Sequence, residues 1–192
     1  MVHISDGVLS PEIWITGYVA TAIILFFTLR RMNVEDVPRV SIVTSAFFVA
    51  SLIHVPIGPT SAHLILNGLV GILLGYSSYP AIFIGLLLQA LLFQHGGITT
   101  LGINTLDMGL PALISYQIFR LKSNPVTAGL VCGLAVFLAV LFTSFVLILS
   151  GEEFYEFAGV FFVAHVPIAI VEAIISTFVI AMIMRVKREV IT

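Results

Sequence analysis

The sequence predicts an all-α integral membrane protein with about seven transmembrane helices. Hydrophobic residues make up 59% of the 192 positions and charged residues only 9%, whereas a soluble domain has roughly 25% charged residues. A bilayer core about 30 Å thick needs roughly 20 apolar residues per helix, so residues 1–192 are expected to form a single transmembrane domain. The formal net charge of -2 excludes a basic surface for binding nucleic acid.

Apolar runs bounded by charges, prolines and polar clusters give the helices in order along the chain. The predicted spans are 12–29, 40–54, 61–75, 80–94, 104–119, 126–149 and 159–184. The first ends at two arginines, the second and third flank segment 55–60, the fourth and fifth flank segment 95–103, and an acidic loop precedes the seventh. Three spans are short for a crossing, so some helices are expected to begin or end inside the protein. We therefore predict irregular backbone, buried or lining a wet cavity, at 55–60 and 95–103.

The basic residues set the predicted orientation. In a seven-span chain they all lie on one side: Arg30, Arg31, Arg39, Arg120, Lys122, Arg185, Lys187 and Arg188. By the positive-inside rule that side is the cytoplasm, which places the N-terminus outside a cell membrane and the C-terminus inside. The first ten residues lack the features of a signal peptide. We therefore expect residues 1–11 to remain as an extracellular N-terminal segment.

Five histidines fall at the outer ends of the predicted helices or in the N-terminal segment: His3, His54, His63, His95 and His165. Any one of them could simply cap a helix or lie at the membrane interface. Five on one face of a chain with so few polar residues favour a shared site, and imidazole is a common ligand of Ni, Cu, Co and Zn. The single cysteine, Cys132, excludes disulfides and thiolate clusters, so a metal would be held by nitrogen or oxygen.

The start of the chain, Met1-Val2-His3, can form fused chelate rings around one ion. If Met1 is retained, its amine, the amides of Val2 and His3 and the His3 ring supply four nitrogens. If Met1 is removed, the Val2 amine and the amide and ring of His3 supply three, and His63 is the predicted fourth ligand. Square-planar nitrogen sites of this kind suit Ni(II) and Cu(II).

Other polar residues are candidates to support the ligands. Glu172 lies inside the seventh span, where an ionisable group is costly and often functional, and it could orient His165 two turns earlier on the same face. Structural roles, such as helix packing or hydrogen bonding to segment 95–103, explain these residues about as well. The candidate supporting residues are His54, Asn67, Gln89, His95, Asn104, Asp107, His165 and Glu172.

The chain carries no His-Glu-x-x-His, Gly-x-Ser-x-Gly or phosphate-loop motif. The sequence therefore does not predict an enzyme, and any ATPase is expected to be a separate chain. Several segments, in order along the whole chain, resemble the CbiM/NikM family of substrate-binding subunits of energy-coupling factor (ECF) nickel and cobalt transporters. The segments that carry this resemblance are 3–11, 58–64, 73–75, 89–93, 96–104, 108–109 and 165–172.

The resemblance implies seven helices and an external N-terminus that folds back into the protein to ligate the metal. The implied ligands are the terminal amine, the amide and ring of His3 and the ring of His63, in a nearly planar set that selects Ni(II) or Co(II) as the transported ion. It also implies a transmembrane coupling subunit, two cytoplasmic ATPases and often a small accessory membrane protein, in a prokaryotic cell membrane, with uptake driven by ATP hydrolysis.

Two positions depart from the family pattern. Family sequences usually begin Met-His, whereas Val2 intervenes here, so either Met1 is removed or His63 becomes an axial or supporting group. Asp107 stands where an Asn is expected, which would place a negative charge near the site or cap a helix. Three alternatives remain open: a vitamin-type ECF substrate-binding subunit, a zinc-dependent intramembrane enzyme with Glu172 as its acid, and a structural subunit with no ligand.

Overall fold

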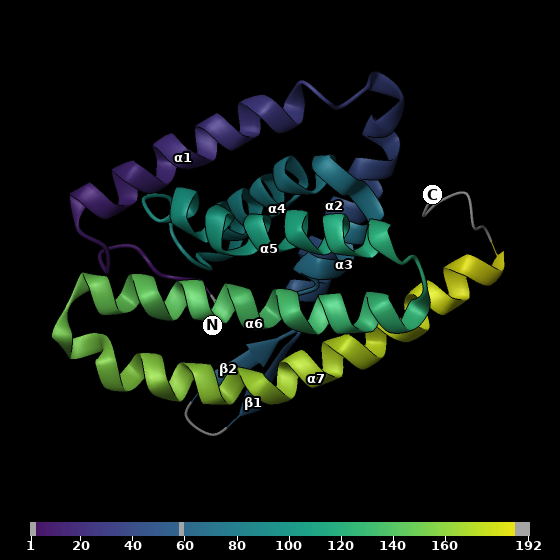
Figure 1. The fold of residues 1–192 in the computed structure, drawn as a ribbon. Helices are drawn as coiled ribbons and strands as arrows, with labels where there is room; N and C mark the ends of the chain where they lie inside the picture. Colours follow the sequence, from purple (N-terminus) through teal and green to yellow (C-terminus); the bar gives the residue numbers. More distant parts are fainter. Residues whose placement is uncertain (1–2, 58–59, 187–192) are drawn as a thin grey trace.

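The computed structural model describes residues 3–57 and 60–186, with backbone only from 54 to 62. Its α-helices and strands, in chain order, are α1 (Pro11–Leu29), α2 (Val37–Ser51), β1 (His54–Ile57), β2 (Thr60–His63), α3 (Asn67–Leu74), α4 (Ser78–Phe93), α5 (Leu101–Leu121), α6 (Pro125–Ser150) and α7 (Tyr155–Val186). Figure 1 shows α6 and α7 as a long antiparallel pair on one side and α1 on the other, with the remaining helices between them.

The fold is almost entirely helical, as predicted for an all-α membrane protein. Among the described residues, four helical segments are long and apolar enough to cross a membrane: Pro11–Leu29, Asn67–Phe93, Pro125–Ser150 and Glu152–Val186. The second of these combines α3, the short 3-10 turn η2 (Gly75–Ser77) and α4, so two predicted spans are parts of one interrupted segment.

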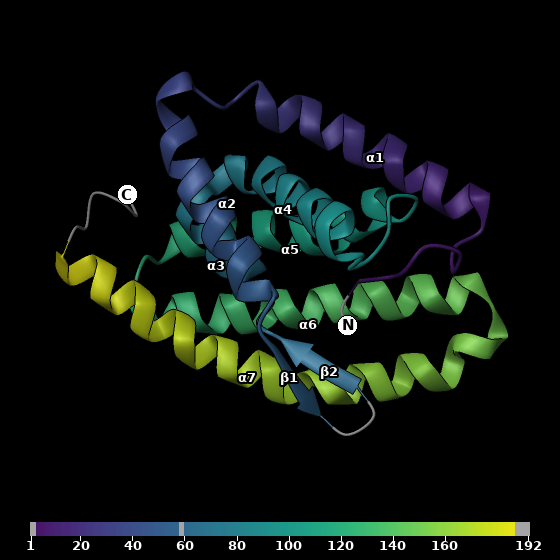
Figure 2. The same cartoon turned by 180° about the vertical axis from the view of Figure 1, so that it is seen from behind.

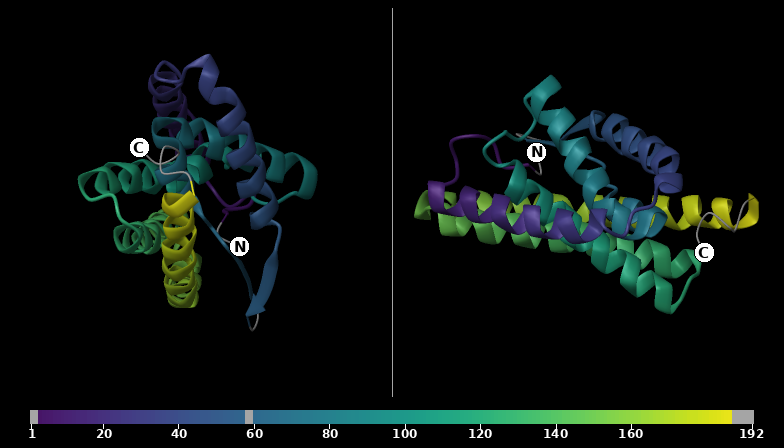
Figure 3. Two further views of the ribbon diagram at one scale, coloured as in Figure 1. Left: turned by 90° about the vertical axis from the view of Figure 1, so that its right-hand side faces the viewer. Right: turned by 90° about the horizontal axis from the view of Figure 1, so that it is seen from above.

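The prediction of a helix over residues 61–75 was wrong for residues 61–66. Strands β1 and β2 pair antiparallel as a hairpin, with His54 opposite His63 and Ile57 opposite Thr60, and the helix begins only at Asn67. Segment 55–60, predicted to be irregular, is therefore mostly strand. Its two prolines exclude a regular helix. β2 contacts α7. Figure 2 shows the hairpin in front of α7, and the left view of Figure 3 shows it extending away from the helices.

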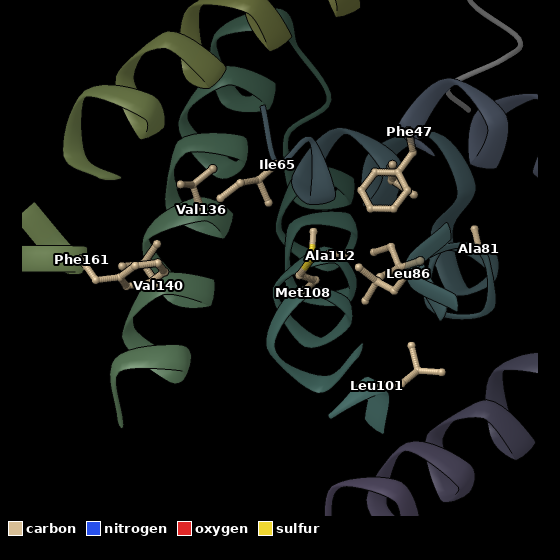
Figure 4. Close-up of a cluster of buried hydrophobic side chains, with 12 residues drawn as sticks. Phe47, Ile65, Ala81, Leu86, Leu101, Met108, Ala112, Val136, Val140 and Phe161 are labelled. Atoms are coloured by element: carbon tan, nitrogen blue, oxygen red, sulfur yellow. The ribbon is translucent and has the colours of Figure 1, made fainter. Parts of the chain in front are cut away.

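Helix α5 lies at the centre of the molecule, and every residue from Leu101 to Gly109 is buried. The largest cluster of buried side chains surrounds it and includes Phe47 of α2, Met108 of α5 and Val136 of α6 (Figure 4). Because protein rather than lipid covers α5, polar residues are tolerated along it. This explains why α5 carries Asn104 and Asp107 and is not among the four apolar spans.

The turn between the hairpin and α3 is held by Glu172, which is fully buried on α7. Its carboxyl oxygens accept hydrogen bonds from the backbone N–H groups of Ile65 and Leu66, the latter at 2.9 and 3.0 Å. Leu66 has a left-handed backbone, with φ of 54°, which turns the chain sharply into α3. Glu172 thereby fixes the backbone two residues after His63.

Replacing Glu172 by leucine is expected to lower the free energy of unfolding by about 2–4 kcal/mol, because two buried N–H groups lose their acceptor. Glu172→Gln keeps one acceptor oxygen and is expected to lose less. Thermal unfolding of the metal-free protein in detergent measures both effects. Equal melting temperatures for wild type and Glu172→Leu would contradict this role.

Candidate metal centre

The N-terminal segment and the end of the hairpin bring two histidines together inside the protein. His3 precedes α1, and His63 ends β2. Their ring centroids are 5.5 Å apart, with ring planes inclined by 31°, and the two residues are only 7% and 4% exposed. Histidines from sequence positions 60 residues apart thus form one buried pair.

The protonation of His3 suits a metal ligand. Neither of its ring nitrogens has a hydrogen-bond partner among the described residues, although buried polar atoms nearly always have one. Burial, the adjacent His63 and, more weakly, His95 hold the pKa of His3 well below 6.5, and the nearby Gln89 side chain raises this pKa by a smaller amount. The ring is therefore neutral near pH 7 and has a lone pair to donate.

The orientation of His63 follows from its backbone contact. Its Nδ1 lies 2.9 Å from the carbonyl oxygen of Leu64, and because a carbonyl only accepts, Nδ1–H is the donor. In the neutral ring Nε2 then carries the lone pair. A backbone carbonyl that fixes the tautomer in this way is typical of metal-binding histidines.

Asn104 and Thr100 hold the residue next to His3. The Asn104 side chain accepts from Ile4 N–H at 2.9 Å and donates to the Ile4 carbonyl at 3.0 Å. The Thr100 hydroxyl donates to the same carbonyl at 2.7 Å. Both backbone polar groups of Ile4 are therefore hydrogen-bonded to side chains of other segments, and this fixes the backbone next to His3.

Asp6 forms a second anchor. Its carboxylate accepts from Ile98 N–H at 3.2 Å, from Thr99 N–H at 2.9 Å and from the Thr99 hydroxyl at 2.5 Å. The Thr99 hydroxyl, with these backbone donors, lowers the pKa of Asp6, so the anchor is charged at neutral pH. A Cβ on Gly97 would lie 2.0 Å from Asp6 Oδ1, so only glycine allows this approach.

Replacing Asn104 by leucine is expected to weaken metal binding about 10- to 50-fold, because two hydrogen bonds worth about 1 kcal/mol each are lost. The matched control is Thr105→Val, since the Thr105 hydroxyl donates only to Leu101 of its own helix. Nickel titration of both variants in detergent checks this. Unchanged affinity in Asn104→Leu would show that the docking of Ile4 does not support the site.

The other candidate residues have different partners. Gln89 is buried and donates to the Ser51 hydroxyl at 2.6 Å. His95 is half-buried in the loop after α4, with its ring 6.1 Å from that of Phe93. Asn67 donates to the Met108 carbonyl at 3.2 Å. The side chain of His54, together with Met1 and Val2, lies outside the described residues.

The hydrogen-bond partners of Asp107, His165 and Glu172 lie in different parts of the protein. His165 contacts the carbonyl of Phe161, one turn earlier in α7, at 2.7 Å through Nδ1, and Glu172 binds the backbone of 65–66, so Glu172 does not orient His165. One Asp107 oxygen accepts from Thr143 of α6, and its other has no partner among the described residues.

Sequence reasoning missed the roles of Thr99, Thr100 and Asp6. Two adjacent threonines in a predicted irregular segment close to Asn104 were the signal that could have indicated these roles. Threonine hydroxyls often form hydrogen bonds with backbone groups outside helices and strands. Segment 95–103 is indeed without helix as far as Thr100, but α5 begins at Leu101.

Side chains alone do not complete a site here. Within 3–57 and 60–186, no three His, Cys, Asp or Glu residues are grouped to hold a metal ion. The His3–His63 pair therefore needs further donors, and backbone nitrogens at the start of the chain are the chemically suitable ones for a nitrogen-rich site.

A nearly all-helical chain with apolar spans and a buried pair of histidines has the features of a membrane protein that handles a transition metal. Residues 3–190 match the CbiM family, described as the cobalt uptake substrate-specific transmembrane region, and the chain belongs to this family. It is 33% identical to the cobalt transport protein CbiM of Kyrpidia tusciae over 99% of this chain and 86% of that protein.

Further relatives agree. The chain is 33% identical to the fused nickel transport protein NikMN of Rhodobacter capsulatus, over 66% of this chain and 39% of that longer protein. A crystal structure of a truncated transition metal transporter superposes with a TM-score of 0.85 at 27% identity, over 95% of this chain and 98% of that one. The chain is therefore a membrane component of cobalt or nickel uptake, and its relatives are named as transporters rather than enzymes.

Proposed function

We propose that this protein captures Ni(II) or Co(II) outside the cell with high affinity, as the substrate-specific subunit of an ATP-driven ECF transporter. The observation that carries the proposal is the buried His3–His63 pair beneath an N-terminal segment anchored by Asn104 and Asp6. The chemistry is capture, not catalysis: the ion exchanges its water for nitrogen donors, and the segment closes over it.

The proposed ligands are the N-terminal amine, backbone amide nitrogen and the rings of His3 and His63. The closeness of the two rings supports the arrangement in which Met1 is removed, Val2 supplies the amine and His63 is the fourth ligand. In the alternative, Met1 is retained and the first three residues supply four nitrogens, with His63 axial or supporting. Both sets are planar and nitrogen-rich, as Ni(II) favours.

We further propose that all seven helices of the domain span or enter the membrane, with the N-terminus outside and the C-terminus in the cytoplasm. The ends of α1 and α5 meet at η2: Arg31 lies over the Tyr76 ring at 4.3 Å, and Gln117 donates to the Tyr76 hydroxyl at 2.7 Å. Arg120 lies 5.4 Å from the ring of Tyr116. This gathering of basic residues at one end supports a cytoplasmic face there.

The partners proposed are a transmembrane coupling subunit, two cytoplasmic ATPases and a small accessory membrane protein. Fusion of nickel or cobalt transport components into one chain in relatives named NikMN and CbiMQ supports association with other membrane components. Uptake of radioactive nickel or cobalt by cells that express the chain with these partners tests the proposal. Uptake that does not depend on ATP hydrolysis would contradict it.

Metal affinity is expected to fall at least about tenfold per pH unit between about pH 8 and pH 5, because amine, imidazole and amide must all lose protons to bind. His3, whose pKa is already well below 6.5, contributes little to this slope near neutrality. Its lowered pKa instead means that the folded state binds fewer protons than the unfolded state, so stability is lost as the pH falls below about 6.5. Nickel titration across this range measures the slope, and an affinity independent of pH would contradict nitrogen ligation.

A further inference from the structure

A cavity of about 450 Å³ leads from the surface to His3. It lies between the N-terminal segment, α6, the start of α7 and the 3-10 turn η3 (Glu152–Phe154). At its outer end are Glu153 and Phe157, both exposed, and at its inner end is His3, which is 7% exposed. The cavity therefore connects solvent with one of the proposed ligands.

The lining suits the passage of a cation. The described lining residues include no Lys or Arg, and the polar ones are His3, Ser5, Thr143 and Glu153. The side chains of Leu147, Phe154 and Phe161 make much of the remaining wall. A carboxylate at the mouth attracts a hydrated divalent ion, and hydroxyl oxygens can replace part of its water before nitrogen ligands take over.

The position of Glu153 is defined by a glycine. A Cβ on Gly151 would lie 2.4 Å from Glu153 Oε2, so the carboxylate occupies space that only glycine leaves open. Because the obstructing atom is the end of a flexible side chain, Gly151→Ala is expected to displace the carboxylate while the backbone stays in place.

A second cavity, of about 370 Å³, lies on the other side of the N-terminal segment and is lined by Asp6, Gln94 and Gly97 among others. Its lining does not include His3. It lies near His3 only at Gly96, where a Cβ would be 3.2 Å from the Cβ of His3. Of these two cavities, only the first has both His3 and a surface carboxylate among its described lining residues.

We infer that the metal ion reaches its ligands through the cavity beneath η3, with the Glu153 carboxylate as its first contact on the protein. This inference rests on the proposed function, because it names the path to that site. Glu153 assists passage and does not hold the bound ion. Its removal should therefore slow association and dissociation by the same factor and leave the dissociation constant unchanged.

The first test is stopped-flow nickel binding to the purified full chain at low ionic strength, followed with a metallochromic indicator. Glu153→Gln and Gly151→Ala are expected to lower the slope of observed rate against nickel concentration about 3- to 10-fold. Glu12→Gln, which removes an outer carboxylate that does not line the cavity, is the matched control and should keep the wild-type slope. Equal slopes for wild type and Glu153→Gln would overturn the inference.

The second test blocks each cavity. Cys132 is buried, so a cysteine introduced as Phe157→Cys or Gln94→Cys is the site for a bulky thiol reagent. Labelling of Phe157→Cys should slow nickel association relative to its own unlabelled form, whereas labelling of Gln94→Cys should not. The reverse pattern would show passage through the second cavity. A wild-type chain that binds no nickel at all would instead refute the proposed function.

Discussion

Replacing His3 by alanine is expected to abolish nickel binding, with an affinity loss of more than about 100-fold, because the ring is a ligand in both proposed geometries. The loss should come without unfolding, since both ring nitrogens lack hydrogen-bond partners among the described residues. Equilibrium nickel titration of the detergent-purified protein measures the affinity, and thermal unfolding without metal measures stability.

The matched control for His3→Ala is His165→Ala. His165 is also buried, but its Nδ1 contacts the carbonyl of Phe161 in its own helix. This variant is expected to keep nickel binding. Wild-type affinity in His3→Ala would show that His3 is not a ligand. Equal losses in both variants would show that the histidines act only through folding.

His63→Ala has the second largest expected effect, and its size depends on which amine begins the chain. If Val2 is the first residue, His63 is the fourth ligand, and its loss should weaken binding about 100-fold or more. If Met1 is retained, the first three residues complete the planar set, and the loss should be at most about tenfold. The same titration in detergent measures this difference.

The N-terminal mass of the purified protein decides which expectation applies. The short distance between the two rings leads us to expect a chain that begins at Val2 together with a large loss in His63→Ala. A chain that begins at Val2 and binds nickel normally without His63 would contradict the proposed ligand set.

The histidine pair, His3 and His63, could be predicted from sequence because so few residues in this chain are polar. A polar or ionisable side chain is costly inside a membrane, so His63, Asn104 and Glu172 were conspicuous, and His3 was conspicuous in the short segment before the first helix. Hydropathy also placed α6 and α7 nearly as the structure has them, since their apolar runs are long and uninterrupted. The apolar runs of α6 and α7 identify these helices without knowledge of contacts between residues far apart in the chain.

The supporting interactions could not be predicted, because they join residues far apart in the chain. Glu172 binds residues 65–66 across more than 100 positions, and Asp6 binds 98–99 across more than 90. The hairpin at 54–63 was also missed: its apolar residues continue those of the following helix, and a hydropathy window does not separate short strands from a helix start. Tertiary packing decided these elements.

The magnetic state of bound nickel tests the central claim most directly, because a planar set of four nitrogens makes Ni(II) diamagnetic, whereas six-coordinate oxygen and nitrogen ligation leaves it paramagnetic. The protein should be loaded with one equivalent of nickel, freed of excess metal and measured by magnetic susceptibility in solution. We predict one diamagnetic nickel ion per chain, absent from His3→Ala. A paramagnetic nickel ion bound by the wild-type protein would contradict the planar N-terminal site.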